Sequence, residues 1–170
     1  HTRKFRYFVQ FLDRPPKIVD EAGQLQATSE LKSIHFKNQT LMFAALAIYQ
    51  SNLFSWFVFT FSDCRNLNRR EVDGLPLSLS DLPDATISTL ANLGKQVAAN
   101  LQKNSSLVPT HFAKYGLLNI QVFQPRLSKP IIDEIDVLLV KHYGFTEEEL
   151  DFIINYDIKY RMGDKLNEGE

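Results

Sequence analysis

The residues of this sequence that could do chemistry are scattered and do not form a catalytic set. The chain has four histidines: His1, His35, His111 and His142. None of them has a second histidine or a carboxylate at the spacing of a metal site. The single cysteine, Cys64, has no histidine near it in the sequence, so a half-buried thiol is a better interpretation than a nucleophile. We therefore expect no metal ion and no covalent catalysis in this chain.

The carboxylates give no better candidate for an active site. Asp133, Glu134 and Asp136 are close in the sequence, but they lie beside the apolar stripe of a predicted helix. A solvated helix face explains them more simply than a general acid and base pair. Pro83-Asp84 and Asp157-Ile158-Lys159 have the residue types of a nuclease motif. Both fall in predicted helices, however, so we attribute this match to chance.

Charge is distributed unevenly along the chain. The whole sequence has 19 basic and 20 acidic residues and a net charge of -1. Residues 1–132 contain 15 basic and 9 acidic side chains, about +6, whereas residues 133–170 contain 4 and 11, about -7. A neutral total therefore conceals a basic body and an acidic carboxyl-terminal end, and nucleic-acid binding is not excluded.

Three basic segments stand out as candidate binding surfaces, and the first of them contains Arg3, Lys4, Arg6, Arg14 and Lys17 with only Asp13 opposed. Between Ala85 and Ile132 there is no acidic residue, while the same span contains Lys95, Lys103, Lys114, Arg126 and Lys129. The polar loop from Ser62 to Glu71 contains Arg65, Arg69 and Arg70, together with Asn66 and Asn68. Such segments suit a polyphosphate backbone, with Asn66, Asn68, Gln121 or Gln124 available to reach base edges. Ordinary solvated surface is the alternative interpretation of the same charges.

Hydrophobic patterning predicts an α+β fold that is strand-rich at its start and helical at its end. Strands are expected over residues 5–11, 31–37 and 117–123, and a short strand that runs into a turn is expected within residues 17–23, where residues are β-prone or alternate apolar with polar. Helices are expected from Asp84, from Lys129 after Ser128, and from a capping box formed by Thr146 and Glu149. The last of these is expected to end near residues 161–163.

The stretch from Asn38 to Ser62 has no charged residue and contains seven aromatic residues. Its length suits a membrane span, but the polar triplet Gln50-Ser51-Asn52 lies at its middle, where a bilayer would disfavour it. We predict instead two buried helices with a bend between them, and Ser51 or Asn52 as the N-cap of the second. Most of the aromatic residues are then part of the core.

Three sequence blocks resemble a known family. Residues 128–136, 142–146 and 149–163 are similar to the carboxyl-terminal end of bacterial Type IIG restriction–modification enzymes and related adenine-specific DNA methyltransferases. Residues 52–57, followed by residues 62–71, also look like a passage of their target-recognition region, where an aromatic helix precedes a polar turn. The carboxyl-terminal blocks are the more specific to this family. Together with the start of a predicted strand at Thr28–Leu31, the blocks cover most of the chain.

The resemblance implies a specificity module that selects the DNA sequence methylated by an S-adenosylmethionine-dependent domain. This chain lacks the Phe-x-Gly-x-Gly cofactor loop and the Asn-Pro-Pro-Tyr type of motif that the family uses for methyl transfer. No catalytic residue is therefore carried over, and we expect no cofactor in this chain. S-adenosylmethionine is expected only for a longer parent enzyme, and the resemblance leaves open whether that parent also cleaves DNA.

The resulting hypothesis concerns a platform that binds double-stranded DNA. Its expected binding residues are Arg65, Asn66, Asn68, Arg69, Arg70, Lys114, Arg126 and Lys129. Lysines would contact phosphates and the loop residues would read bases in the major groove, while the acidic end faces the methyltransferase domain of the parent. A non-catalytic protein-interaction or structural domain is the alternative function.

The expected organisation has three parts. Residues 1–126 form the target-recognition-like α+β domain, residues 127–163 a helical pair packed on it, and residues 164–170 a frayed acidic tail. With one cysteine there is no internal disulfide, so a reducing, cytoplasmic compartment is expected.

Overall fold

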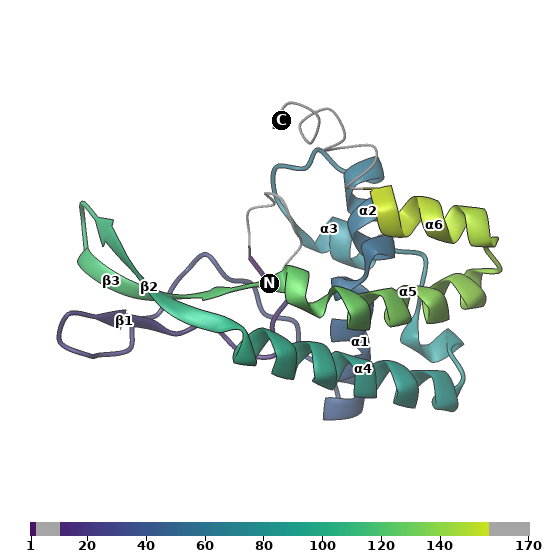
Figure 1. The fold of residues 1–170 in the computed structure, drawn as a ribbon, viewed down its shortest axis with the longest axis horizontal. Helices are drawn as coiled ribbons and strands as arrows, with labels where there is room; N and C mark the ends of the chain where they lie inside the picture. The colour runs from purple at the N-terminus through teal and green to yellow at the C-terminus, as the bar shows by residue number, and fades with distance from the viewer. Residues whose placement is uncertain (3–10, 157–170) are drawn as a thin grey trace.

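The computed structural model describes residues 1–2 and 11–156, and it confirms the α+β class. The helices are α1 (Gln39–Gln50), α2 (Asn52–Phe61), α3 (Arg69–Asp73), α4 (Asp84–Lys103), α5 (Lys129–Tyr143) and α6 (Glu147–Tyr156), with strands β1 (Ile18–Asp20), β2 (Ser105–Phe112) and β3 (Gly116–Phe123). Figure 1 shows a helical body from which the three strands project to one side.

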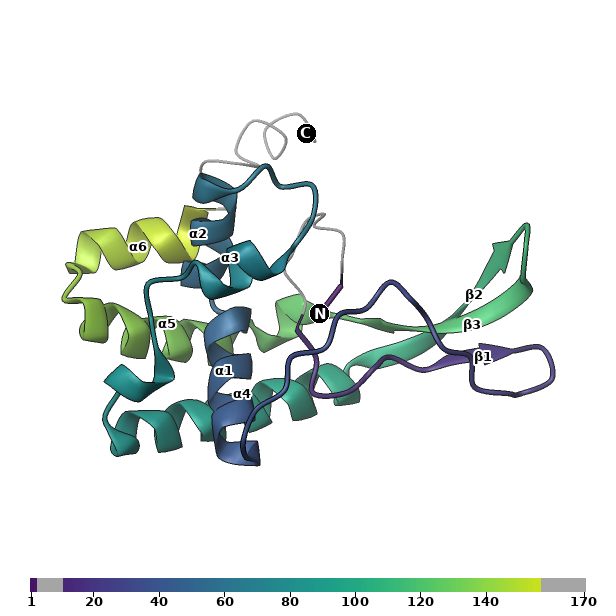
Figure 2. The same cartoon turned by 180° about the vertical axis from the view of Figure 1, so that it is seen from behind.

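The helical body has two layers. Helices α4, α5 and α6 lie side by side, and α1 and α2 cross them, as both views show (Figures 1 and 2). The most extensive helix contact joins α1 to α4, while α5 contacts α1, α2, α4 and α6. Helix α5 therefore occupies the centre of the body and connects the two layers.

A bend at Ser51 separates α1 from α2, as the uncharged stretch predicts. The Ser51 hydroxyl accepts a hydrogen bond from the Phe54 N–H at 3.0 Å, which makes Ser51 the N-cap of α2. The two helix axes differ by 61°. Among the residues that the structure describes, no single helix has the length and apolar character to cross a membrane, and only this bent pair meets both criteria when taken together.

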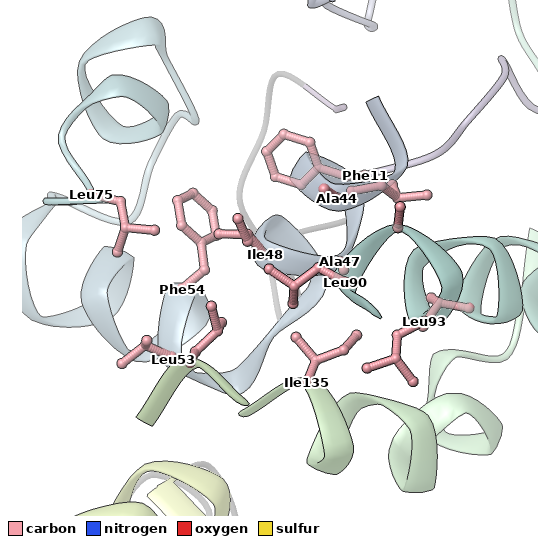
Figure 3. Packing of buried hydrophobic residues seen from close by; sticks show 14 of the residues in the cluster. Phe11, Ala44, Ala47, Ile48, Leu53, Phe54, Leu75, Leu90, Leu93 and Ile135 are labelled. Atoms are coloured by element: carbon pink, nitrogen blue, oxygen red, sulfur yellow. The ribbon is translucent and has the colours of Figure 1, made fainter. Parts of the chain in front are cut away.

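The hydrophobic core lies where the two layers meet (Figure 3). Phe54 of α2, Leu90 of α4 and Ile135 of α5 are each fully buried. Ile135 and Ile153 belong to the same cluster as residues of α1 and α4, so the core continues across residue 126. The carboxyl-terminal helices are thus packed into the body and share its core.

Close packing of α1 against α4 depends on Gly94. A Cβ atom at this position would overlap the carbonyl oxygen of Phe43 and crowd the backbone nitrogen of Ala47. Both obstacles are backbone atoms of α1, so no side-chain rotation could relieve the overlap. The contact between the two helices requires a glycine here.

The strands form an antiparallel sheet in the order β1-β3-β2. Strands β2 and β3 pair along their whole length, from Ser105 opposite Phe123 to Phe112 opposite Gly116, and β1 pairs with the middle of β3, from Leu118 to Ile120. Gly116 has a φ of 72°, in the left-handed region that glycine adopts without strain. We refer to residues 105–123 as the arm, which Figures 1 and 2 show extending away from the helices.

The sequence predictions for strands had mixed outcomes. The short strand predicted within residues 17–23 is confirmed at Ile18–Asp20, and the strand predicted over residues 117–123 is also confirmed, whereas β2 was missed because Pro109 lies in its middle. A proline is tolerated there because β2 is an edge strand, where its missing N–H removes no ladder bond. The strand predicted over residues 31–37 is wrong, since only Leu31 pairs, in an isolated bridge with Thr2. The strand predicted over residues 5–11 falls almost entirely outside the described residues.

The predictions for the carboxyl-terminal helices are confirmed at their capping residues. Helix α5 ends at Gly144, whose φ of 69° places it in the left-handed region. The Thr146 hydroxyl then accepts from the Glu149 N–H at 3.2 Å, and the Glu149 carboxylate accepts from the Thr146 N–H at 2.7 Å. The predicted end of this helix near residues 161–163 lies outside the described residues.

Replacing Gly94 by alanine should destabilise the fold. The added methyl group would force α1 away from α4, so we expect the free energy of unfolding to fall by about 2–3 kcal/mol. Gln96→Ala, on the exposed face of the same helix, should change it by less than about 0.5 kcal/mol. Urea denaturation followed by circular dichroism measures both, and equal effects would contradict the close helix contact.

Candidate nucleic-acid interface

The basic loop after α2 is organised around the first turn of α3. The Asn68 N–H donates to the Glu71 carboxylate at 2.8 Å, which is one half of a capping box. The Asn68 side-chain oxygen accepts from the Lys32 ammonium at 2.9 Å. Asn68 therefore holds the loop in place, and reading a base through this amide oxygen would require the lysine contact to break.

Arg70 is tied to a buried carboxylate. Its guanidinium approaches the Glu71 carboxylate at 2.8 Å, and the Glu71 side chain is only 3% exposed. Burial alone would raise the pKa of Glu71, but the hydrogen bonds from Asn68 and Arg70 lower it below its usual value. The guanidinium itself is largely exposed, so it can meet a phosphate while its Nε–H remains on Glu71.

The other loop residues are more accessible. Arg69 is 91% exposed and its ion pair with Asp73, at 2.7 Å, lies in solvent. Such a pair contributes less than about 1 kcal/mol, so Asp73 does not prevent Arg69 from contacting an anion. Arg65 and Asn66 are exposed, and Arg65 has no ion pair with a described residue. Cys64 precedes them as the half-buried thiol that the sequence predicts.

The remaining predicted residues lie on or near the arm. Lys114 is in the turn at its tip, and Arg126 lies in a short 3-10 helix, η2 (Pro125–Ser128), at its base. Both side chains are exposed and neither pairs with a carboxylate in the described part of the chain. Lys129 differs, because its ammonium contacts both oxygens of Asp133 at 2.8 and 2.9 Å.

The two basic regions occupy different parts of the molecule. Figure 1 places α3 on the helical body and the β2–β3 turn at the far end of the arm, and Figure 2 shows the same separation. Arg65–Arg70 and Lys114 therefore do not form one patch. Arg126, close to the arm's base, is joined there by Lys103 at the end of α4, because the Gln124 N–H bonds to the carbonyl of Asn104.

Gln121 has a structural role that its sequence position does not reveal. Its side-chain oxygen accepts from the Lys17 N–H at 3.0 Å, and its amide donates to Gln102 and to Ser105 at 3.1 and 2.8 Å. These bonds join β1, α4 and the arm. The expectation that Gln121 is available to read a base is therefore corrected.

Lys32 is a basic residue near the loop that sequence reasoning missed. Its contact with Asn68 spans 36 positions of the chain, and no local motif predicts such a contact. A surface hollow of about 590 Å³ lies beside it, lined by His1, Lys32, Ser33, Ile34, His35, Arg69, Val72 and Asp73. The hollow places Lys32 and His35 near Arg69, which extends the basic surface of the loop.

Asp136 contradicts the expectation of a solvated helix face. It is completely buried, and its carboxylate accepts from the N–H groups of Asn52 and Leu53 at 3.2 and 2.9 Å and from the Asn52 side-chain amide at 2.8 Å. These donors form the first turn of α2, where backbone N–H groups lack partners within the helix. The sequence around Asp136 does not predict this contact, because its partners belong to α2 and meet Asp136 only when α5 packs on α2.

Burial raises the pKa of Asp136 to about 7, and the hydrogen bonds from Leu53 and Asn52 oppose that rise. Asp133 raises it further, since a second carboxylate disfavours the charged form. The carboxylate is fully buried between α2 and α5 and lines none of the three hollows formed by residues 1–74. Its role is structural, and it does not form an acid and base pair with Asp133.

The described residues offer binding chemistry more readily than catalytic chemistry. No group of three metal-binding side chains occurs within residues 1–2 and 11–156. The site presents exposed arginine and lysine side chains in three places: the loop that leads into α3, the tip of the arm and the base of the arm. Such an arrangement can bind phosphate groups through charge-assisted hydrogen bonds.

Removing the Asp136 carboxylate should destabilise the protein strongly. Asp136→Ala leaves three donors at the start of α2 without a partner, so we expect a loss of about 3 kcal/mol in the free energy of unfolding. Asp136→Asn retains one acceptor and the side-chain volume, and its loss should be smaller. Equal stability of wild type and Asp136→Ala in urea would contradict the anchoring role.

Stability should also depend on pH through Asp136. Between its usual pKa of 3.8 and its folded value of about 7, the folded protein retains a proton that the unfolded chain releases. The stability from this group is fully present below pH 4 and is lost as the pH rises through 7. The free energy of unfolding of Asp136→Asn, measured in urea at several pH values, should fall less between pH 4 and 7 than that of the wild type. The same pH dependence in both proteins would contradict the role of Asp136.

The fold and the two basic regions can be compared with known proteins. Searches of protein-family models, curated proteins and solved structures found no match. The resemblance to restriction–modification enzymes therefore remains an expectation from sequence blocks.

Proposed function

We propose that this chain is the DNA sequence-recognition module of a restriction–modification methyltransferase. It positions duplex DNA for S-adenosylmethionine-dependent methylation of adenine by a catalytic domain outside this chain. The observation that carries the proposal is the acid-free span between Ala85 and Ile132, which folds into α4, the arm and η2. A projecting element without carboxylates is suited to approach a polyanion.

The unpaired cations are the main phosphate contacts in this proposal. Lys114, Arg126 and Arg65 have no ion pair with a carboxylate of residues 11–156 that contact with DNA would break, whereas Lys129 would have to leave Asp133. Arg69 is an additional contact because its pair with Asp73 is solvated. Asn66, exposed between the arginines, is the residue best placed to reach a base edge.

The acidic surface is expected to turn away from DNA. Helix α6 begins with Glu147, Glu148 and Glu149, and its described part, up to Tyr156, contains no basic residue. Like charge would repel the phosphates from this part of the body, which leaves it available to the methyltransferase domain of the parent. The module would thus bind DNA on one side and the catalytic domain on another.

Binding of duplex DNA should weaken steeply with salt. The fluorescence anisotropy of a labelled random-sequence duplex, titrated with the 170-residue chain in 50–200 mM salt, gives the affinity. Each phosphate contact should contribute about -0.9 to the slope of log K against log salt. A slope near zero would contradict the proposal.

Charge reversals identify the contacts. Lys114→Glu, Arg126→Glu and Arg69→Glu should each lower the affinity several-fold, because each replaces an attraction to phosphate by a repulsion. Lys141→Glu, an exposed reversal in the last turn of α5, is the matched control and should have little effect. Arg70 is unsuitable for this test because its loss would leave the buried Glu71 without its cation. Equal effects at Lys114 and Lys141 would exclude a specific surface.

A second candidate function is supported by the apolar character of the arm. Leu107, Val108 and Val122 are 51%, 39% and 45% exposed, and exposed apolar residues grouped on one element often mark a protein contact. In this alternative the chain is a non-catalytic interaction domain of a multidomain enzyme. DNA affinity that is weak and insensitive to salt would favour it over recognition of DNA.

A further inference from the structure

The tip of the arm has a fixed conformation. The Tyr115 N–H bonds to the carbonyl of Phe112 at 3.2 Å, and Phe112 pairs with Gly116 at the end of the ladder. The left-handed Gly116 completes a three-residue loop of the kind that closes antiparallel hairpins. Ala113, Lys114 and Tyr115 therefore form the end of a hydrogen-bonded ribbon, which both views place at the extremity of the arm (Figures 1 and 2).

An aromatic side chain at this tip has no role in the core. Tyr115 is 64% exposed and Phe112 is 38% exposed, and neither belongs to the hydrophobic core cluster or packs against it. Exposing a large aromatic surface is unfavourable in water, and its burial in a complex would be favourable. The position of Tyr115 suits contact with a partner better than it suits stability.

Charge favours a nucleic acid as that partner. The Lys114 ammonium lies 5.1 Å from the centre of the Tyr115 ring, so a cation and an aromatic face are presented together. The described strands of the sheet carry one carboxylate, Asp20 of β1, which is paired opposite Leu118. Hydrogen bonds from Gln24 and Gln26 lower the pKa of Asp20 and hold it ionised, and the charged side chain at the tip itself is Lys114.

The side chains along the arm favour insertion over base reading. Gln121 is committed to its three hydrogen bonds, while Leu107, Val108 and Val122 are apolar and exposed. Apolar side chains cannot read donor and acceptor patterns in the major groove. They can contact the sugars of the minor groove and fill the space between two separated base pairs.

We propose that the arm enters the minor groove, that Tyr115 inserts between adjacent base pairs, and that the duplex bends as a result. Lys114 would contact the phosphates beside the opened step. The inference rests on the proposed function and deepens it, because it assigns a deformation of the DNA to one residue. Bending would allow the arm and the loop of Arg65–Arg70, which lie apart, to meet the same duplex.

A duplex labelled at both ends with a fluorescent donor and acceptor tests the proposal. Saturation with the wild-type chain should raise the energy transfer, because a bend brings the ends closer. Tyr115→Ser should abolish this increase while weakening binding less than tenfold, and Tyr115→Phe, which retains the ring, should preserve it. Lys114→Gln should weaken binding and reduce the salt slope by about 1, yet bend the DNA at saturation.

Phe61→Ser is the matched control, because Phe61 is 66% exposed but lies at the end of α2, away from the arm. It should leave both binding and bending unchanged. Circular dichroism melting of each variant confirms that the chain is folded, which is expected because Tyr115 lies outside the core.

The outcomes separate the two proposals. Wild-type binding without bending, or normal bending by Tyr115→Ser, overturns the insertion and leaves the proposed function intact. Absence of duplex binding by the folded wild type overturns both. Self-association in sedimentation experiments that Tyr115→Ser abolishes, without any binding of DNA, would assign the tip to a protein contact and also overturn the insertion.

Discussion

The buried carboxylate of Asp136 is the interaction on which the helical body depends. It brings a side chain of α5 to the first turn of α2, immediately after the bend at Ser51. The start of a helix carries partial positive charge, so the carboxylate oxygens are stabilised where they lie. This contact and the Ser51 cap, in which the hydroxyl accepts from the Phe54 N–H, set the angle between α1 and α2. Without the Asp136 contact, the two layers would be joined mainly by apolar packing, which is less directional.

Contacts with the helical body fix the orientation of the arm. Helix α4 is held against α1 by the close approach at Gly94 and continues directly into β2. Gln121 then links the arm to α4 and to β1, and the Gln124 N–H bonds to the end of α4. The projecting strands are therefore a continuation of the core helix. Their tip is held at a defined place relative to α3, which a binding surface of two separated regions requires.

Features that depend on a few adjacent residues could be predicted from the sequence. The Ser51 cap, the Thr146 and Glu149 capping box and the stop at Gly144 are all of this kind. Asp136, Lys32 and Gln121 were misjudged or missed, because their partners come from distant segments and are not encoded in local spacing. For the site, the sequence indicated which residues are basic. It did not indicate that Arg70 and Lys129 are paired, or that Lys114 stands apart from the loop.

Pro109 has a consequence for how the chain behaves in a crowded solution. Strand β2 is an open edge, and its sequence Ser-Ser-Leu-Val-Pro-Thr-His-Phe contains no lysine, arginine or carboxylate to discourage another strand from adding to it. A free edge of this kind is a template for aggregation. The proline ring at its centre removes one donor and places bulk where a neighbouring backbone would dock. The arm can thus stay extended and apolar without growing into an intermolecular sheet, because a single residue interrupts the edge.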